Sequence, residues 1–148
     1  MKIKKLTLSN FMAFENLHLE WSDNINVMCG ENSTGKTTLL KVMYSLTKPL
    51  NEVSRENLTK EMEEQYFVKK LQGVFRPDEM KLGRLVSRKR GNKRTDFSVD
   101  LEKKQKVSVG FSRGQTNHAD IDIVKSKFVE KYEAIYIPTK EMISTVEH

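Results

Sequence analysis

The stretch Gly30-Glu31-Asn32-Ser33-Thr34-Gly35-Lys36-Thr37 is the most informative part of this sequence. It matches G-x-x-x-x-G-K-[ST], the pattern of the phosphate-binding P-loop, at every fixed position. The apolar run 25–29 precedes it, and apolar residues spaced three and four apart follow it over 36–47. A P-loop requires this order, with a strand that ends at the loop and a helix that begins from it. The sequence therefore predicts a P-loop, against the alternative of a glycine-rich turn that binds nothing.

Each position of the loop has a physical role in phosphate binding. Gly30 and Gly35 permit backbone conformations in which successive N–H groups converge on an anion. Lys36 supplies an ammonium to the β and γ phosphates, and the first turn of the helix adds its partial positive charge. The Thr37 hydroxyl is a candidate ligand of Mg2+, and Thr38 is a candidate contact to the α phosphate. The predicted nucleotide-binding residues are Gly30, Glu31, Asn32, Ser33, Thr34, Gly35, Lys36, Thr37 and Thr38.

The residues around the loop predict an α/β arrangement. Residues 2–8 and 15–21 alternate apolar and polar side chains, which is typical of half-buried strands. The short linker between them favours an antiparallel pair. The run 25–29 is apolar enough for a central strand. The helix after the loop is expected to end near residue 47, helped by Pro49.

The second half of the chain changes pattern more than once. Residues 55–72 are rich in helix formers, so a second helix with a charged, solvated face is expected there. Residues 120–131 predict a short helix. The strand-like segments are 85–86, 97–101, 107–111 and 134–137. The first three predict a small antiparallel meander, and the last suits a buried parallel strand.

Composition restricts the class of protein. The 148 residues have the size of one domain, and 37% hydrophobic with 31% charged residues is typical of a globular chain. Apolar runs fall short of the roughly 18 residues that a membrane span needs, and the start lacks the continuous apolar stretch of a secretory signal. The single cysteine, Cys29, fits a reducing compartment. We expect a cytoplasmic protein with no membrane partner, and Cys29 as an inert buried thiol.

The net charge of +6 comes from one local patch. Seven basic residues and no acidic residue lie between Lys81 and Arg94. The densest part, Arg88, Lys89, Arg90, Lys93 and Arg94, surrounds the turn signal Gly91-Asn92 and is expected at a hairpin tip. One interpretation is a contact with DNA phosphates. The other is a solvated tip, because edge hairpins carry such charges against aggregation and no aromatic residue for base stacking is interleaved here.

Three segments together resemble a known family. They are KIKKLTLSNF at 2–11, INVMCGENSTGKTTLL at 25–40 and YIPTKEM at 136–142. They resemble the amino-terminal part of ABC-type ATPases of the RecF/SMC/OLD group, and within it the bacterial AAA ATPases of phage-defence systems. The resemblance implies ATP and Mg2+ as cofactors, head-to-tail pairing with a second copy or with the rest of the ATPase, and a role in DNA transactions or phage defence.

The resemblance also implies an architecture. The expected fold class is α/β, a P-loop NTPase lobe of the ABC ATPase type, with a mixed sheet and an antiparallel β subdomain, and incomplete within this chain. The expected parts are 1–50 (strands, P-loop and first helix), 51–80 (helical excursion), 81–115 (antiparallel hairpins with the basic tip) and 116–148 (helix and strand).

Two departures from the family pattern bear on catalysis. Relatives carry Arg or Lys where this chain has Met12, which puts a basic contact to nucleotide at that point in doubt. The second departure is a missing carboxylate: the family pattern has an apolar run that ends in an acidic residue. The nearest candidate here, 135–137, is followed by Pro138 instead. Without that carboxylate nothing orients the attacking water, so hydrolysis should be very slow in this segment alone. The resemblance offers Glu141 as a contact to Mg2+. A truncated hydrolase is the first interpretation, and a non-catalytic nucleotide- or DNA-binding module complete in itself is the alternative.

Two further features have competing interpretations. The segment 111–115, Phe-Ser-Arg-Gly-Gln, resembles the signature by which such ATPases contact a partner's γ phosphate. It also ends an alternating strand, where a glycine-containing loop is ordinary, and we favour the loop. The aromatic residues Phe11, Phe14 and Trp21 are expected in the core rather than as a platform for adenine.

Overall fold

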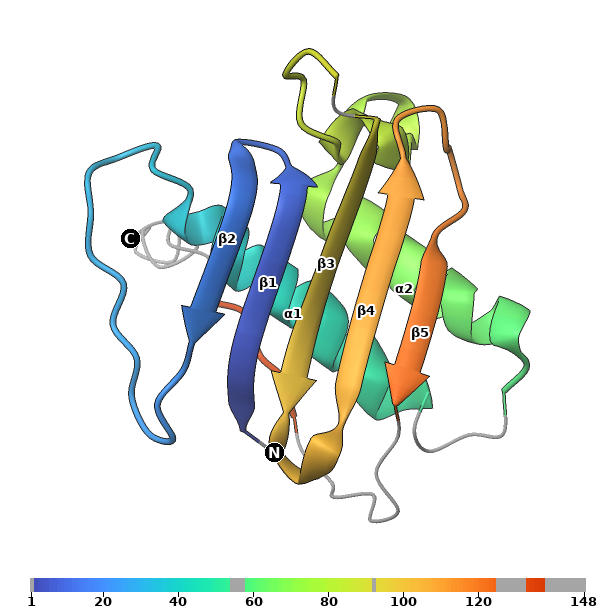
Figure 1. The fold of residues 1–148 in the computed structure, drawn as a ribbon. Coiled ribbons are helices and arrows are strands. Elements are labelled where there is room, and N and C mark those ends of the chain that lie inside the picture. The colour runs from blue at the N-terminus through green and yellow to red at the C-terminus, as the bar shows by residue number, and fades with distance from the viewer. Residues whose placement is uncertain (1, 54–57, 92, 125–132, 138–148) are drawn as a thin grey trace, which may run out of the picture.

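A computed structural model of the chain describes residues 2–53, 58–91, 93–124 and 133–137 (Figure 1). These residues form a five-stranded sheet with two helices packed on one face (Figure 1). The strand order is β2-β1-β3-β4-β5, and every pairing among these strands is antiparallel. The strands are β1 (Ile3–Phe11), β2 (Phe14–Glu20), β3 (Arg94–Leu101), β4 (Lys106–Ser112) and β5 (Asp120–Val124).

The sheet forms because apolar side chains alternate along its strands. One face of the pleat buries Leu6 and Leu8 of β1 against the helices, and the residues between them face the other way. Phe11 is fully buried, and its ring lies edge-on to Phe75 at 5.2 Å and to Phe97 at 5.0 Å between centroids. The buried residues of the other central strands are Phe97, Val99, Leu101, Val107, Val109 and Phe111. The predicted β1–β2 pair is confirmed, and of the predicted three-segment meander the β3–β4 pair is confirmed while 85–86 is not a strand of the sheet.

Helix α1 (Lys36–Val53) begins where the sequence predicts and ends later. It continues through Pro49, so the expectation that this proline ends the helix is wrong. An interior proline costs about 3 kcal/mol. Leu46, Leu50 and Val53 are fully buried around it, and burying each such side chain contributes about 1.5–3 kcal/mol. The burial of these three side chains therefore outweighs the cost of a proline inside the helix.

Helix α2 (Lys60–Phe75) confirms the predicted second helix. The hydroxyl of Thr59 caps it by accepting a hydrogen bond from the Met62 amide at 3.3 Å. Its buried side chains are Phe67, Val68 and Leu71. Within the described chain, neither α1 nor α2 combines the length and the apolar content that a bilayer span requires.

Gly73 gives a stability prediction in α2. A methyl group at this position meets no atom within 4 Å, and the residue is exposed. Alanine loses less backbone entropy on folding than glycine, so Gly73→Ala should raise the free energy of unfolding by about 0.5–1 kcal/mol. Urea unfolding followed by circular dichroism measures this, and a lowered midpoint would contradict it.

Two predicted strands are wrong. Segments 25–29 and 134–137 lie outside the sheet, with Ile25 84% and Val27 78% exposed, and with Ile135 and Ile137 exposed by 73% and 72%. Cys29 is also exposed, against the expectation of a buried thiol. An apolar run becomes a strand only when a neighbouring strand takes up its N–H and C=O groups, and no described strand pairs with either segment.

Two further elements differ from the expectation. Residues 82–85 form a short 3-10 helix, η2 (Leu82–Leu85), and only Val86 makes an isolated bridge, to Phe11. Residues 120–124 form β5 rather than the start of a helix, and the rest of that predicted helix lies outside the described residues. Ile121 and Ile123 alternate with aspartates, a period-two signal that predicts a strand. The remaining short elements are η1 (Asp78–Met80) and η3 (Glu102–Lys104).

Candidate functional site

The predicted P-loop lies between segment 25–29 and the start of α1, so the helix that its pattern requires is present, whereas the described strands include none that leads into the loop. Three of its residues have positive φ angles: Gly30 at 156°, Ser33 at 65° and Gly35 at 92°. The first helical hydrogen bond runs from the Leu39 amide to the Gly35 carbonyl at 3.0 Å. Alternation into left-handed conformations is how a loop forms a concave nest for an anion, and glycine adopts them without strain.

Lys36 folds its side chain back onto this loop. Its Nζ donates to the carbonyl oxygens of Gly30 at 2.7 Å and Glu31 at 2.5 Å, and lies 3.3 Å from Thr34 Oγ1. Thr34 Oγ1 in turn donates to the Glu31 carbonyl at 2.9 Å. The ammonium and the loop backbone therefore converge on one small region.

Gly30 lies beside this ammonium. A Cβ at this position would lie 3.3 Å from Thr34 Oγ1 and 3.9 Å from Lys36 Nζ. The first of these distances is tighter than an ordinary Cβ contact, so a side chain at residue 30 would press on Thr34 beside the positive charge. A phosphate oxygen that approaches this backbone would meet the positive charge of Lys36.

The other predicted nucleotide-binding residues lie in the same place. Glu31, Asn32, Ser33 and Thr34 are exposed along the loop. Thr37 is exposed and Thr38 half-buried, both in the first turn of α1, where backbone N–H groups lack helical partners. The structure thus places all nine residues in one loop and one helical turn.

Phe14 is a residue of this region whose role the sequence did not reveal. It begins β2, and its ring packs on Gly35 so closely that a Cβ at Gly35 would overlap Cζ and lie 3.0 Å from Cε2. Phe14 and Trp21 are half-buried and pack against the core, while Phe11 is fully buried. Met12, at the turn between β1 and β2, is 42% exposed.

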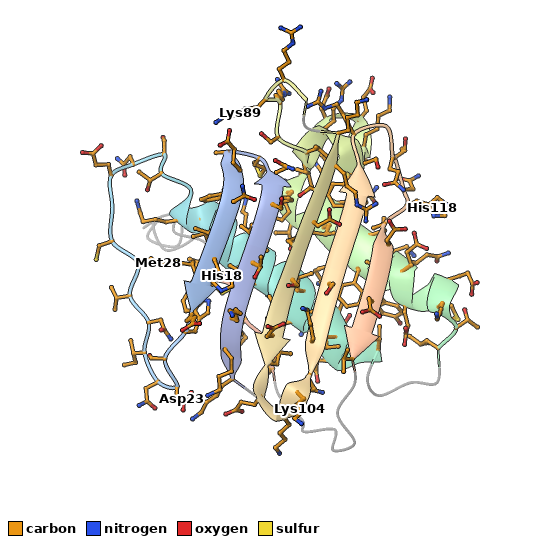
Figure 2. The ribbon with its side chains drawn as sticks, viewed as in Figure 1. His18, Asp23, Met28, Lys89, Lys104 and His118 are labelled. Atoms are coloured by element: carbon orange, nitrogen blue, oxygen red, sulfur yellow. The ribbon has the colours of Figure 1, made fainter. Side chains whose placement is uncertain are left out.

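The basic residues lie at the end of the sheet that carries the β1–β2 turn, where Figure 2 shows Lys89. They do not form the predicted hairpin tip. The described residues 87–91 and 93 lie between Val86 and β3, and Val86 pairs with β1 rather than with β3, so that the Ser87 amide bonds to the Asn10 carbonyl at 2.7 Å. We call the described residues 87–91 and 93 the basic loop.

Two of the five basic residues that are predicted to contact nucleic acid form ion pairs with carboxylates of this chain. Lys89 forms an ion pair with Glu15. Arg94 begins β3 and donates to Asp120 at 2.7 Å and to Asp96 at 2.9 Å. The hydrogen bonds to Asp120 and Asp96 hold the pKa of Arg94 above its ordinary value. Arg88, Arg90 and Lys93 are exposed.

The signature-like segment 111–115 is a turn after β4. Ser112 ends the strand, its amide donates to the side chain of Gln115, and the Gln115 amide bonds to the Ser112 carbonyl at 3.0 Å. No helix starts here within the described residues up to 124, so the loop interpretation is confirmed. Glu141 and Pro138 lie outside the described residues.

The fold and the loop define a class, the α/β P-loop ATPase lobe. The family model described as "AAA ATPase domain" matches residues 1–128. The chain therefore belongs to the AAA ATPase domain family.

Two curated relatives are DNA replication and repair proteins RecF. That of Clostridioides difficile (strain 630) is 39% identical over 62 residues, which are 42% of this chain and 16% of the relative. That of Lachnoclostridium phytofermentans is 46% identical over 44 residues, 30% of this chain and 12% of the relative. The matched region thus spans less than a fifth of either relative.

Two solved structures share the fold. One comes from a study of ATP-driven dimerization and DNA-stimulated activation of SMC ATPases, with a TM-score of 0.56 and 10% identity over 85% of this chain and 71% of that chain. The other is the recombination mediator RecF with ATP, with a TM-score of 0.51 and 16% identity over 84% of this chain and 29% of that chain. The expected RecF/SMC-type lobe is confirmed as a fold.

Proposed function

We propose that residues 30–38 bind the triphosphate of ATP together with Mg2+. The observation that carries this is the convergence of the Lys36 ammonium on the positive-φ loop, where it lies beside Gly30. Membership of the AAA ATPase domain family supports ATP as the nucleotide.

The residues of the site divide the work of binding. Lys36 would exchange the carbonyls of Gly30 and Glu31 for phosphate oxygens, a stronger charge-assisted contact. The N–H groups at the start of α1 add partial positive charge. The Thr37 hydroxyl would hold the metal ion. Bound ATP would supply a transferable γ-phosphoryl group.

We propose that the whole protein is an ATPase of DNA transactions or phage defence, working in the cytoplasm through head-to-tail pairs, with weak or no hydrolysis by this segment alone. The names of the RecF relatives support work on DNA. The competing function is a nucleotide-binding module that signals by occupancy. Turnover by the full-length protein, measured as phosphate release, separates the two.

Lys36→Ala tests the site directly. The variant should bind MgATP at least about tenfold more weakly, because it removes a charge-assisted contact to the phosphates. Titration calorimetry measures the affinity, and Lys48→Ala, further along α1, is the matched control. Folded wild-type protein that gives no heat with MgATP, or a Lys36→Ala variant that binds as wild type, would overturn the proposal.

We also propose that the basic residues Arg88, Lys89, Arg90, Lys93 and Arg94 contact nucleic acid. Their excess charge at one end of the sheet supports this. Lys89 and Arg94 would contribute less to this binding than the other three residues. A phosphate would have to compete with their ion-pair partners Glu15, Asp96 and Asp120.

A further inference from the structure

The turn that follows β4 is fastened to η2. The Gly83 amide bonds to the Gln115 carbonyl at 2.8 Å, and the Leu82 amide bonds to the Thr116 carbonyl at 3.0 Å. The backbones approach so closely that a Cβ at Gly83 would overlap the carbonyl oxygen of Arg113. The position of Arg113 is therefore restricted by its own carbonyl, which lies against Gly83, and by the hydrogen bonds of the two residues 115 and 116.

Arg113 in turn holds the basic loop at several points. Its guanidinium Nη2 donates to the Ser87 carbonyl at 2.7 Å and lies 3.4 Å from the Lys89 carbonyl. Its backbone N–H bonds to the Lys93 carbonyl at 2.8 Å. A single residue thus contacts the beginning and the end of the loop.

The side chains of the loop point to an anionic partner. Arg88, Arg90 and Lys93 are exposed, and they have no ion-pair partner among the residues that the structure describes. The sequence 87–93 contains no acidic residue, and the ion pair of Glu15 among the described residues is with Lys89. Three cations on one anchored segment match the repeated charges of a phosphodiester backbone.

We propose that Arg113 is a positioning residue that holds the basic loop in the shape in which Arg88, Arg90 and Lys93 bind nucleic-acid phosphates. The proposal deepens the nucleic-acid contact proposed above and rests on it for the choice of partner. The loop has no aromatic residue, so the contact is with the backbone and is insensitive to base sequence. In this proposal the signature-like segment 111–115 acts on its own chain, because its Arg113 positions the basic loop.

The first measurement counts phosphate contacts. The affinity for a fluorescein-labelled, mixed-sequence DNA duplex is measured by anisotropy over a series of KCl concentrations. The triple variant Arg88→Ala, Arg90→Ala, Lys93→Ala should lower the slope of log K against log salt by about 0.9 for each phosphate that the variant no longer neutralises. Lys104→Ala is the control, because Figure 2 shows Lys104 at the opposite end of the sheet from Lys89, and its slope should equal that of wild type.

The second measurement separates position from charge. Arg113→Lys keeps the charge but loses the planar fork that reaches two carbonyls. It should bind the duplex about tenfold more weakly, because the loss of one charge-assisted hydrogen bond changes an equilibrium constant by about that factor. Trypsin should also cleave faster after Arg88, Lys89 and Arg90, because the loop opens more often. Wild-type affinity, or unchanged cleavage, in Arg113→Lys would overturn the positioning role.

The same samples distinguish this inference from nucleotide binding. MgATP titration of each variant should give the wild-type affinity, since the loop 30–38 is intact. If wild type binds MgATP but not the duplex, the inference fails and the nucleotide site stands. Binding of heparin with no binding of DNA would overturn the nucleic-acid partner. The triple variant leaves Arg113 unchanged, so it remains informative if Arg113→Lys fails to fold.

Discussion

Gly83→Ala is expected to lower the free energy of unfolding by about 3 kcal/mol or more, because overpacking against rigid backbone is among the most destabilising changes. The added methyl would overlap the carbonyl oxygen of Arg113, which cannot rotate away as a side chain can. Relief of the clash would separate η2 from the turn after β4. The bonds from Gly83 to Gln115 and from Leu82 to Thr116 would then lengthen or break. Urea unfolding with fluorescence or circular dichroism detection measures the loss.

Gly114→Ala is the matched control for this prediction. It lies next to Arg113, and a Cβ there meets no atom within 4 Å. Its unfolding midpoint should stay close to that of wild type. Equal midpoints for Gly83→Ala and Gly114→Ala would show that the close approach of the two backbones is not present in solution.

Gly35→Ala is expected to weaken MgATP binding by about 30-fold or more. The φ angle of 92° strains any residue with a Cβ, at a cost of about 1–2 kcal/mol. The methyl would also overlap the Phe14 ring, which adds about 1–3 kcal/mol of overpacking. The loop can escape both costs only by leaving the conformation that we propose for phosphate binding. Calorimetry with MgATP measures the change.

The double variant Phe14→Ala, Gly35→Ala separates these two causes. Removal of the ring relieves the overlap and leaves the φ strain, so affinity should recover in part and remain below that of Phe14→Ala alone. Full recovery would show that the ring contact is the whole effect. Wild-type affinity in Gly35→Ala itself would mean that the loop conformation described for Gly35 is not needed for binding.

Local patterns in the sequence predicted the elements that depend on local chemistry. The alternation in β1, β2, β3 and β4 identifies them because period two places apolar side chains on one face of a pleat. The start of α1 at Lys36 follows from the loop pattern and the apolar spacing after it. Two of the three segments that carry the family resemblance, 2–11 and 25–40, overlap β1 and the start of α1.

Contacts between distant residues decided what the sequence left open. Segments 25–29 and 134–137 have strand-like composition, but a strand needs a partner, and partners are a tertiary property. Pro49 stays inside α1 because Leu46, Leu50 and Val53 are buried around it. Val86 pairs with β1 instead of β3. The basic residues therefore lie in a loop and not, as the sequence had predicted, at the tip of a hairpin.

The sequence by itself determined the phosphate-binding pattern, because its chemistry resides in eight consecutive positions, Gly30 to Thr37. Only the tertiary structure set Phe14 against Gly35, Gly83 against Arg113, and Arg113 across the basic loop. The physical reason is that glycine and arginine carry no periodic signal. Their roles here depend on which backbone comes within a few ångströms of them, and the packing of the sheet and helices decides that.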